Sequence, residues 1–193
     1  MTDLFRDLDF AVVYLDDILI FSSTKEEHWQ QLDKVLSHLK EAKLIAKVDK
    51  CKFGQESVNF LGHQVSKHGI ESLQEKCEAI RKMQIRKEIE GVQRFLGVCN
   101  FYRRFIHNCS HIAQPLVNFL SQIEHWSKRQ EEAIENLRKA LSSPPLLTPF
   151  TTGDNCRLTT DASMQGLGAV LEKLLDNKVL GVVNYFSKTF QSP

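Results

Sequence analysis

The amino-acid sequence predicts an α+β fold, and three patterns along its 193 residues carry that prediction. Short β-rich apolar segments open the chain, amphipathic helical patterns fill its middle, and strand-like runs joined by turns close it. Apolar residues make up 42% of the chain, which is enough for a packed core. We therefore expect a β-hairpin with a helix, a mostly helical middle and a small β-rich tail.

The opening hairpin is predicted by the sequence "FAVVYLDDILIFS", residues 10–22. Its two apolar halves, 10–15 and 18–22, favour short strands that place Asp16 and Asp17 at or beside the turn. Aspartate tolerates the left-handed backbone that such a turn needs, so the two aspartates are compatible with the turn.

An amphipathic helix is expected next. Residues 24–27, Thr-Lys-Glu-Glu, fit a capping box that opens a helix running to about residue 42. Four large apolar residues at helical spacing share one of its faces: Trp29, Leu32, Leu36 and Leu39. Short strands broken by glycines are then expected at 44–48, 57–66 and 69–72.

Helical patterns fill the middle of the chain, at 73–86, 89–105, 112–120 and 128–141. The proline-containing stretch "SSPPLLTPF" and the polar "TTGDN" that follows it, together residues 142–155, predict a linker. Three strand-like runs come after the linker, at 156–163, 166–174 and 179–187, with a hairpin signal at 176–178.

Both ends of this arrangement lack packing partners. Three strands with one hydrophobic face and no covering helix are marginally stable alone, and so is a two-stranded hairpin that is apolar on both faces. We therefore expect the chain to be truncated at both ends.

The composition excludes several classes of protein. With 25 basic and 24 acidic residues, the whole chain is not a strongly basic nucleic-acid binder. The five scattered cysteines form no C-x-x-C pair, which favours a reduced, intracellular setting. No apolar run is long enough to span a membrane, so no membrane partner is expected. The sequence "HNCSH", residues 107–111, has neither the spacing nor the count of a zinc site and is expected to end a helix.

Two adjacent carboxylates inside an apolar run need an explanation, because like charges repel and an unpaired buried charge is costly. One explanation is a polar turn that lifts Asp16 and Asp17 into water. The other is a cation between them, since paired hard oxygens suit Mg²⁺, which binds carboxylates together with substrate phosphates. Two such ions about 4 Å apart can stabilise the attacking and leaving oxygens of nucleotidyl transfer.

The sequence segments around these aspartates resemble a known family. The motif "YLDD" inside "VVYLDDILIFS" is similar to the Y-x-D-D motif of reverse transcriptases, and three further stretches, "KCKFGQESVNFLGHQVSKHGI", "VQRFLGVCNFYRRFI" and "LTTDAS", follow in that family's order. The chain thus resembles the reverse transcriptase and ribonuclease H region of a gypsy-type LTR retrotransposon (retroviral-like) Pol polyprotein. The implied substrates are an RNA or DNA template–primer duplex and deoxynucleoside triphosphates.

The resemblance assigns the carboxylates and their neighbour to the polymerase site. Asp16 and Asp17 match the palm carboxylates that hold catalytic Mg²⁺, and Tyr14 matches the tyrosine beside the primer terminus. Asp161 in "TTDAS" matches the first metal-binding carboxylate of ribonuclease H. For a lone "TDAS", an aspartate serving a turn at a strand end is the alternative.

Two further stretches match nucleic-acid contacts of the family. The sequence "FLGH" (Phe60, Leu61, Gly62 and His63) matches the hairpin that grips the primer strand, with a strand–bulge–strand packing element as the alternative.

The second stretch matches the thumb helix that tracks the minor groove of the duplex. Gln93, Gly97 and Phe101 fall on one helical face at i, i+4 and i+8. A helical glycine costs about 1 kcal/mol against alanine, so Gly97 needs a reason, which is either close approach to a sugar or tight helix–helix packing.

The charge of this region also favours contact with nucleic acid. Residues 76–107 hold eight basic and three acidic residues, a net charge of +5, which favours phosphate contacts. Four neighbours are expected in the core instead: Phe95, Leu96, Val98 and Tyr102.

Four segments follow from the resemblance: the C-terminal palm with the grip hairpin at 1–72, the thumb at 73–125, a connection helix and linker at 126–152, and the first ribonuclease H strands at 153–193.

The chain also departs from the family. The third polymerase aspartate has no counterpart, because Asp3, Asp7 and Asp9 fall too close to the hairpin, and the later ribonuclease H carboxylates are missing. We therefore expect a fragment of an RNA-directed DNA polymerase that is inactive alone. The alternatives are a non-catalytic nucleic-acid-binding module domesticated from a retroelement and a decayed copy without function.

Overall fold

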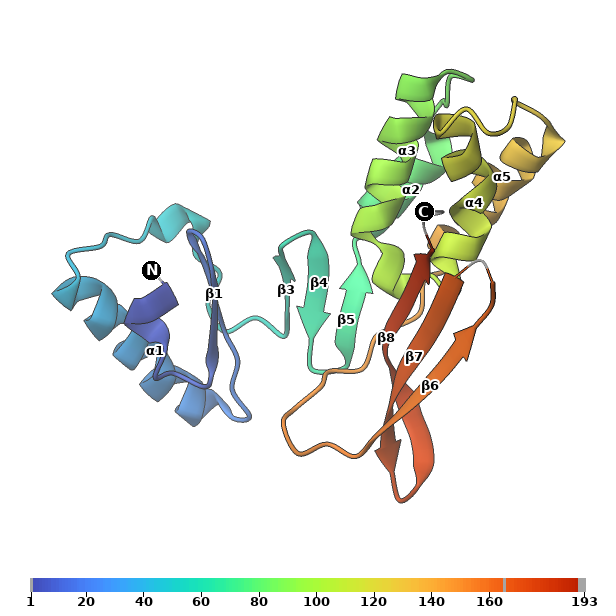
Figure 1. The fold of residues 1–193 in the computed structure, drawn as a ribbon. Helices are drawn as coiled ribbons and strands as arrows, with labels where there is room; N and C mark the ends of the chain where they lie inside the picture. Colours follow the sequence, from blue (N-terminus) through green and yellow to red (C-terminus); the bar gives the residue numbers. More distant parts are fainter. Residues whose placement is uncertain (1, 165, 191–193) are drawn as a thin grey trace. The chain divides into compact units, whose positions relative to one another are not determined.

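The computed structural model describes residues 2–164 and 166–190 and divides the chain into two compact units, Met1–Leu61 and Gly62–Pro193. Each unit combines helices and antiparallel strands around its own apolar core, which confirms the α+β class (Figure 1).

The first unit is a small hairpin covered by one long helix. Phe5, Val35 and Leu39 form its buried centre, and apolar side chains of the hairpin pack around them. Its elements are a 3₁₀ turn η1 (Thr2–Phe5), the strands β1 (Ala11–Tyr14) and β2 (Asp17–Ile20), the helix α1 (Lys25–Glu41), a 3₁₀ turn η2 (Val48–Lys50) and the strand β3 (Ser57–Phe60).

The start of α1 confirms Thr24 as the N-cap, but only half of the predicted capping box forms. The hydroxyl of Thr24 accepts a hydrogen bond from the Glu27 amide at 3.2 Å, whereas the Glu27 carboxylate accepts one from the Ser23 amide at 2.9 Å and not from the Thr24 amide that a capping box uses. Of the four residues expected on the apolar face, Leu32 and Leu39 are buried, whereas Trp29 is 60% and Leu36 43% exposed. A two-stranded hairpin covers only the narrow stripe that contains Leu32, Val35 and Leu39.

The strand expected at 44–48 is absent. Residues 44–47 have no regular structure, η2 follows them, and Ile45 is 94% exposed. Its β-rich sequence finds no partner strand among the described residues, and a strand without a ladder leaves its backbone groups to water.

The second unit contains a hairpin, a helical cluster and a three-stranded sheet. The hairpin is β4 (His63–Ser66) with β5 (Gly69–Ser72), paired antiparallel. The helices are α2 (Gln74–Lys82), α3 (Ile89–Phe101), η3 (Arg103–Phe105), α4 (Cys109–Leu120) and α5 (Lys128–Ser142). The strands β6 (Cys156–Ala162), β7 (Gly166–Leu175) and β8 (Lys178–Thr189) form an antiparallel sheet in sequence order.

Several boundaries in the second unit differ from the sequence prediction. α2 ends at Lys82, four residues early, and α3 ends at Phe101 before the separate turn η3. "HNCSH" does not end a helix. Asn108 takes a left-handed backbone with φ 52° and begins α4 at Cys109. These breaks depend on single backbone conformations that hydrophobic periodicity does not encode.

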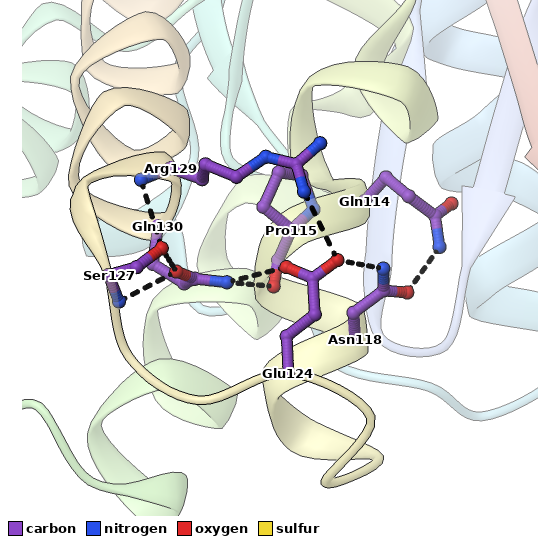
Figure 2. A network of polar contacts seen from close by, with 7 residues as sticks. All are labelled: Gln114, Pro115, Asn118, Glu124, Ser127, Arg129 and Gln130. Atoms are coloured by element: carbon purple, nitrogen blue, oxygen red, sulfur yellow. Dashed lines mark hydrogen bonds and ion pairs between the residues drawn. The ribbon is translucent and has the colours of Figure 1, made fainter.

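The loop between α4 and α5 is fixed by a buried amide. The Gln130 side chain is fully buried and donates to the Pro115 carbonyl at 3.0 Å and to the Glu124 carboxylate at 3.1 Å (Figure 2). Its oxygen accepts from the Ser127 amide at 2.9 Å, which completes a capping box at the start of α5. The hydrogen bond from the Asn118 side chain is the largest cause that lowers the pKa of Glu124, and the hydrogen bond from Gln130 lowers it further.

The predicted linker is instead a packed strap. Leu147 is fully buried and pairs with Ile70 of β5 through two backbone hydrogen bonds of 2.9 and 3.0 Å. The next amide, of Thr148, donates to the Val182 carbonyl of β8 at 2.7 Å. The prolines and serines of this stretch predicted a loop. The structure differs because the Leu147 side chain is buried and its backbone groups form hydrogen bonds with Ile70, which is distant in sequence.

The three-stranded sheet packs against the helical cluster through β8. The Arg103 guanidinium donates to the Ser187 carbonyl, and the buried Ser187 hydroxyl accepts from the Ser110 amide at 2.9 Å. The β7–β8 turn confirms the predicted hairpin, since Asp176 and Asn177 both have positive φ, at 51° and 61°, as a type I′ turn requires.

Candidate nucleic-acid and metal sites

The two aspartates stand at the end of the β1–β2 hairpin. Tyr14 pairs with Asp17, so Leu15 and Asp16 form a two-residue turn. The left-handed residue is Leu15, with φ 51°, and not an aspartate, which corrects the sequence expectation. A bulky residue in that conformation is strained, and such strain persists where surrounding structure demands it. Both carboxylates and the Tyr14 ring are exposed.

This turn presents two carboxylates whose chemistry can be compared with the needs of Mg²⁺. Asp16 and Asp17 are adjacent hard-oxygen donors facing solvent, which suits an ion that takes one or two carboxylates and completes its shell with water and phosphate. No cluster of three or more His, Cys, Asp or Glu able to hold a metal occurs in the described ranges 2–164 and 166–190. The donor set therefore fits Mg²⁺ in kind and supplies two carboxylates.

The "FLGH" stretch straddles the division between the two units. Phe60 and Leu61, both partly buried, belong to the first unit, and Leu61 has φ 48°. Gly62 has φ 77°, and a Cβ added to it would lie 2.8 Å from the Phe101 ring. Glycine is thus required at position 62 both by backbone conformation and by the close approach of an aromatic side chain.

Gly62 and His63 pack against the C-terminal end of α3. The Tyr102 hydroxyl donates to the Gly62 carbonyl at 3.2 Å, and the His63 ring stacks on Phe101 with centroids 5.2 Å apart. Burial and the nearby Arg104 charge lower the pKa of His63, so its ring is neutral at pH 7. The sequence placed Tyr102 in the core. It is buried, and its hydroxyl also holds the backbone of the hairpin, a role that helical spacing alone could not show.

The three residues matched to the thumb helix are brought together on one exposed face of α3. Gln93, Gly97 and Phe101 all face solvent, while Phe95 and Cys99 on the opposite side are buried. A Cβ added to Gly97 would meet nothing within 4 Å. Packing among the described residues therefore gives no reason for glycine at position 97.

An acidic residue from another helix offsets part of the net charge of +5 on residues 76–107. Lys87 pairs with Glu131 of α5, which lies outside that segment. The pair between Lys82 and Glu78 lies within the segment and is already counted in the net charge, and Arg103 donates to a neutral carbonyl of β8. The sequence of the segment alone could not reveal the pair with Glu131.

Asp161 lies in β6 of the three-stranded sheet. It pairs in register with Gly168 of β7, and its side chain is exposed. Its position within a strand, with the ladder continuing to Ala162, differs from the turn that a lone "TDAS" would favour.

Comparison with known proteins identifies two segments of the chain. Residues 1–65 match the family described as reverse transcriptase (RNA-dependent DNA polymerase). Residues 126–193 match the family described as RNase H-like domain found in reverse transcriptase. Every helix within the described residues is too short or too polar to cross a bilayer.

Related sequences and structures agree with these matches. The Tf2-3 and Tf2-7 transposon polyproteins of Schizosaccharomyces pombe (strain 972 / ATCC 24843) are 37% and 36% identical over 179 residues, which is 92% of this chain and 13% of each relative. The foamy viral protease-reverse transcriptase, solved in complex with RNA/DNA hybrid, superposes with a TM-score of 0.83 at 25% identity, covering 98% of this chain and 26% of that one. The dRH form of that protein, in complex with ds DNA, gives 0.85 at 25% identity, covering 98% and 34%.

The fold and the two matched segments define the class of this chain, which is a reverse transcriptase and RNase H-like region of a retroelement polyprotein. More particularly, the chain belongs with the polyproteins of gypsy-type LTR retrotransposons, as the identity to Tf2 shows. This confirms the family that the motifs resembled. The chain spans about one eighth of the length of these relatives.

Proposed function

We propose that this chain binds the template–primer duplex of reverse transcription through α3 and the β4 end of the grip hairpin. The observation that carries the proposal is the open face of α3, where Gly97 bares the backbone between Gln93 and Phe101. Nothing in the described structure fills the space above Gly97, so a nucleic-acid sugar could approach the helix closely there.

The neighbouring hairpin supports the same proposal. His63 and Tyr102 pack around Phe101 and so hold one end of the proposed binding face rigidly in place. A neutral His63 can stack on Phe101 without the cost of burying a charge. Phe60 and Leu61 would continue the grip on the primer strand. Two solved structures similar to this chain were determined in complex with ds DNA and with an RNA/DNA hybrid.

The catalytic part of the proposal concerns the parent polyprotein. Asp16 and Asp17 would hold Mg²⁺ for nucleotidyl transfer from deoxynucleoside triphosphates, beside a primer terminus positioned by Tyr14, and Asp161 would serve the ribonuclease H site. The ion would supply positive charge to the phosphates when bound. Among the described residues no third His, Cys, Asp or Glu joins this pair to hold a metal, so we expect this chain to be inactive alone and to act within an intracellular polyprotein.

The segments of the proposed function follow the family order. Residues 1–72 would form the palm edge and grip, 73–125 the thumb, 126–152 the connection, and 153–193 the opening strands of ribonuclease H.

Duplex binding is tested by fluorescence anisotropy of a labelled RNA/DNA hybrid at several salt concentrations. We expect salt-sensitive binding, weakened about tenfold by Gln93→Ala, since an amide contact to the duplex is worth about 1.4 kcal/mol. Asn136→Ala, which shortens an exposed amide on α5, is the matched control and should leave the affinity unchanged. Equal losses in both variants, or no binding by the wild type, would overturn the proposal.

Primer extension in the same tubes tests the catalytic part. We expect no extension by this chain with Mg²⁺ and an RNA template. Extension that the double variant Asp16→Asn/Asp17→Asn abolishes would show that the site is complete, and the claim of inactivity would be wrong.

A further inference from the structure

An apolar groove of about 590 Å³ lies between α2 and α3. Ile80 and Tyr102 lie deepest in it, each only 3% exposed, and Met83 and Val98 line its walls. This groove is separate from the solvent face of α3 that carries Gln93 and Gly97, because neither residue lines it. Its volume lies within the range of small-molecule sites in proteins, which is about 300–1,000 Å³.

The walls of the groove favour a flat aromatic group. The Phe101 and Tyr102 rings meet edge to face with centroids 4.8 Å apart, and both rings border the groove. The Met83 thioether is a soft, adaptable contact for an aromatic ring. Ala79 and Gly62 are small, so they leave the space open where larger residues would fill it.

The only charged residues lining the groove are lysines. Lys82 already pairs with Glu78 at 3.1 Å. Lys76 is exposed, and among the described residues no ion pair or hydrogen bond engages its ammonium group. A free cation at the edge of an apolar surface complements a ligand with one negative charge and an apolar body. A nucleic-acid backbone would find too few cations here, because the remaining lining is apolar.

We propose that this groove binds a small aromatic acid, with its ring against Ile80 and Met83 and its carboxylate toward Lys76. The proposal concerns a site distinct from the duplex-binding face, although Phe101 borders both. Aromatic acids combine the flat apolar body and the single negative charge that the groove and Lys76 accommodate.

Methionine methyl NMR tests the proposal directly, because the chain has three methionines and only Met83 lines the groove. The full chain, labelled with ¹³C at the methionine methyls, is titrated with 1-naphthoate, its neutral alcohol analogue and its cationic amine analogue. We expect the Met83 signal to shift saturably with naphthoate, with a Kd of about 1 mM or tighter. Met164 is 98% exposed and should not respond.

Charge variants and a filling variant sharpen the test. Lys76→Glu should weaken naphthoate binding about tenfold, whereas the same reversal at the distant, exposed Lys178 should leave it unchanged. Ala79→Leu should abolish the Met83 response while far-UV circular dichroism stays that of the wild type.

Three results would overturn the assignment: no saturable shift of Met83, equal affinity for the three analogues, or equal weakening by the two charge reversals. No readout involves nucleic acid, so this proposal and duplex binding succeed or fail independently.

Discussion

The same substitution at the two glycines of α3 is expected to change stability in opposite directions. Gly97→Ala adds a methyl group that meets no atom within 4 Å, whereas Gly91→Ala places one 2.5 Å from the Arg86 carbonyl oxygen. Gly91 lies in the first turn of α3 and Gly97 in its interior, so alanine gains no more helix preference at position 91 than at position 97, and this contact sets the opposite sign expected there.

The magnitudes follow from helix preference and overpacking. Alanine is favoured over glycine in a helix by about 1 kcal/mol, so Gly97→Ala should raise the free energy of unfolding by about that amount. At Gly91 the neighbour is backbone and cannot swing aside, and relieving such a contact costs about 1–3 kcal/mol. Gly91→Ala should therefore lower the free energy of unfolding, by up to about 2 kcal/mol.

Urea unfolding followed by tryptophan fluorescence measures both effects. A Trp29→Phe background leaves Trp126, which packs on Phe119 in the second unit, as the reporter. In the anisotropy assay, Gly97→Ala should weaken hybrid binding about tenfold despite the higher stability, because the methyl group occupies the space proposed for a sugar. Stabilisation together with weaker binding separates a functional glycine from a structural one.

Three results would refute this reasoning. A loss of stability in Gly97→Ala would mean that the glycine serves packing within the chain. Unchanged hybrid affinity would mean that no close approach occurs at that position. A gain of stability in Gly91→Ala would show that Arg86 yields, and the argument from the 2.5 Å contact would be wrong.

Three further predictions follow from buried or paired groups. Gln130→Leu should lower the free energy of unfolding by about 2–4 kcal/mol in urea, because it removes the amide hydrogen bonds and leaves the Pro115 carbonyl without its donor. Burial raises the pKa of Cys99 to about 12, so iodoacetamide at pH 8 should spare it in the native protein and alkylate the partly exposed Cys51 and Cys156, as mass spectrometry would show. The hydrogen bond from Lys173 lowers the pKa of Asp154 below its ordinary 3.8, so this contribution to stability is complete above pH 3.8 and disappears as pH falls through the lower native value.

Each of these has a control. Gln74→Leu at the exposed start of α2 should change stability by less than about 0.5 kcal/mol, and an equal loss there would contradict the role given to Gln130. Alkylation of Cys99 at the rate of Cys156 would contradict its burial. Lys173→Met should return the carboxyl titration of Asp154, followed by NMR, toward 3.8, and an unchanged midpoint would contradict the pairing.

Local signals in the sequence determined much of this molecule. The hairpin at the two aspartates, the N-cap at Thr24, the β7–β8 turn and the order of the family motifs depend on residues close together in the chain. The shared face of Gln93, Gly97 and Phe101 also follows from helical spacing alone, because that geometry is fixed by the backbone.

The tertiary structure decided what depends on partners distant in sequence. Residues 147 and 148 became part of a packed strap because Leu147 pairs with the backbone of Ile70 and the Thr148 amide donates to the Val182 carbonyl. Part of the positive charge near α3 is offset because Glu131 of α5 pairs with Lys87. Leu15 took the strained turn position because the register of β1 and β2 placed it there. Composition predicts which residues can be buried or paired, but the partner is set only when the chain folds back on itself, so these features could not be predicted from the sequence.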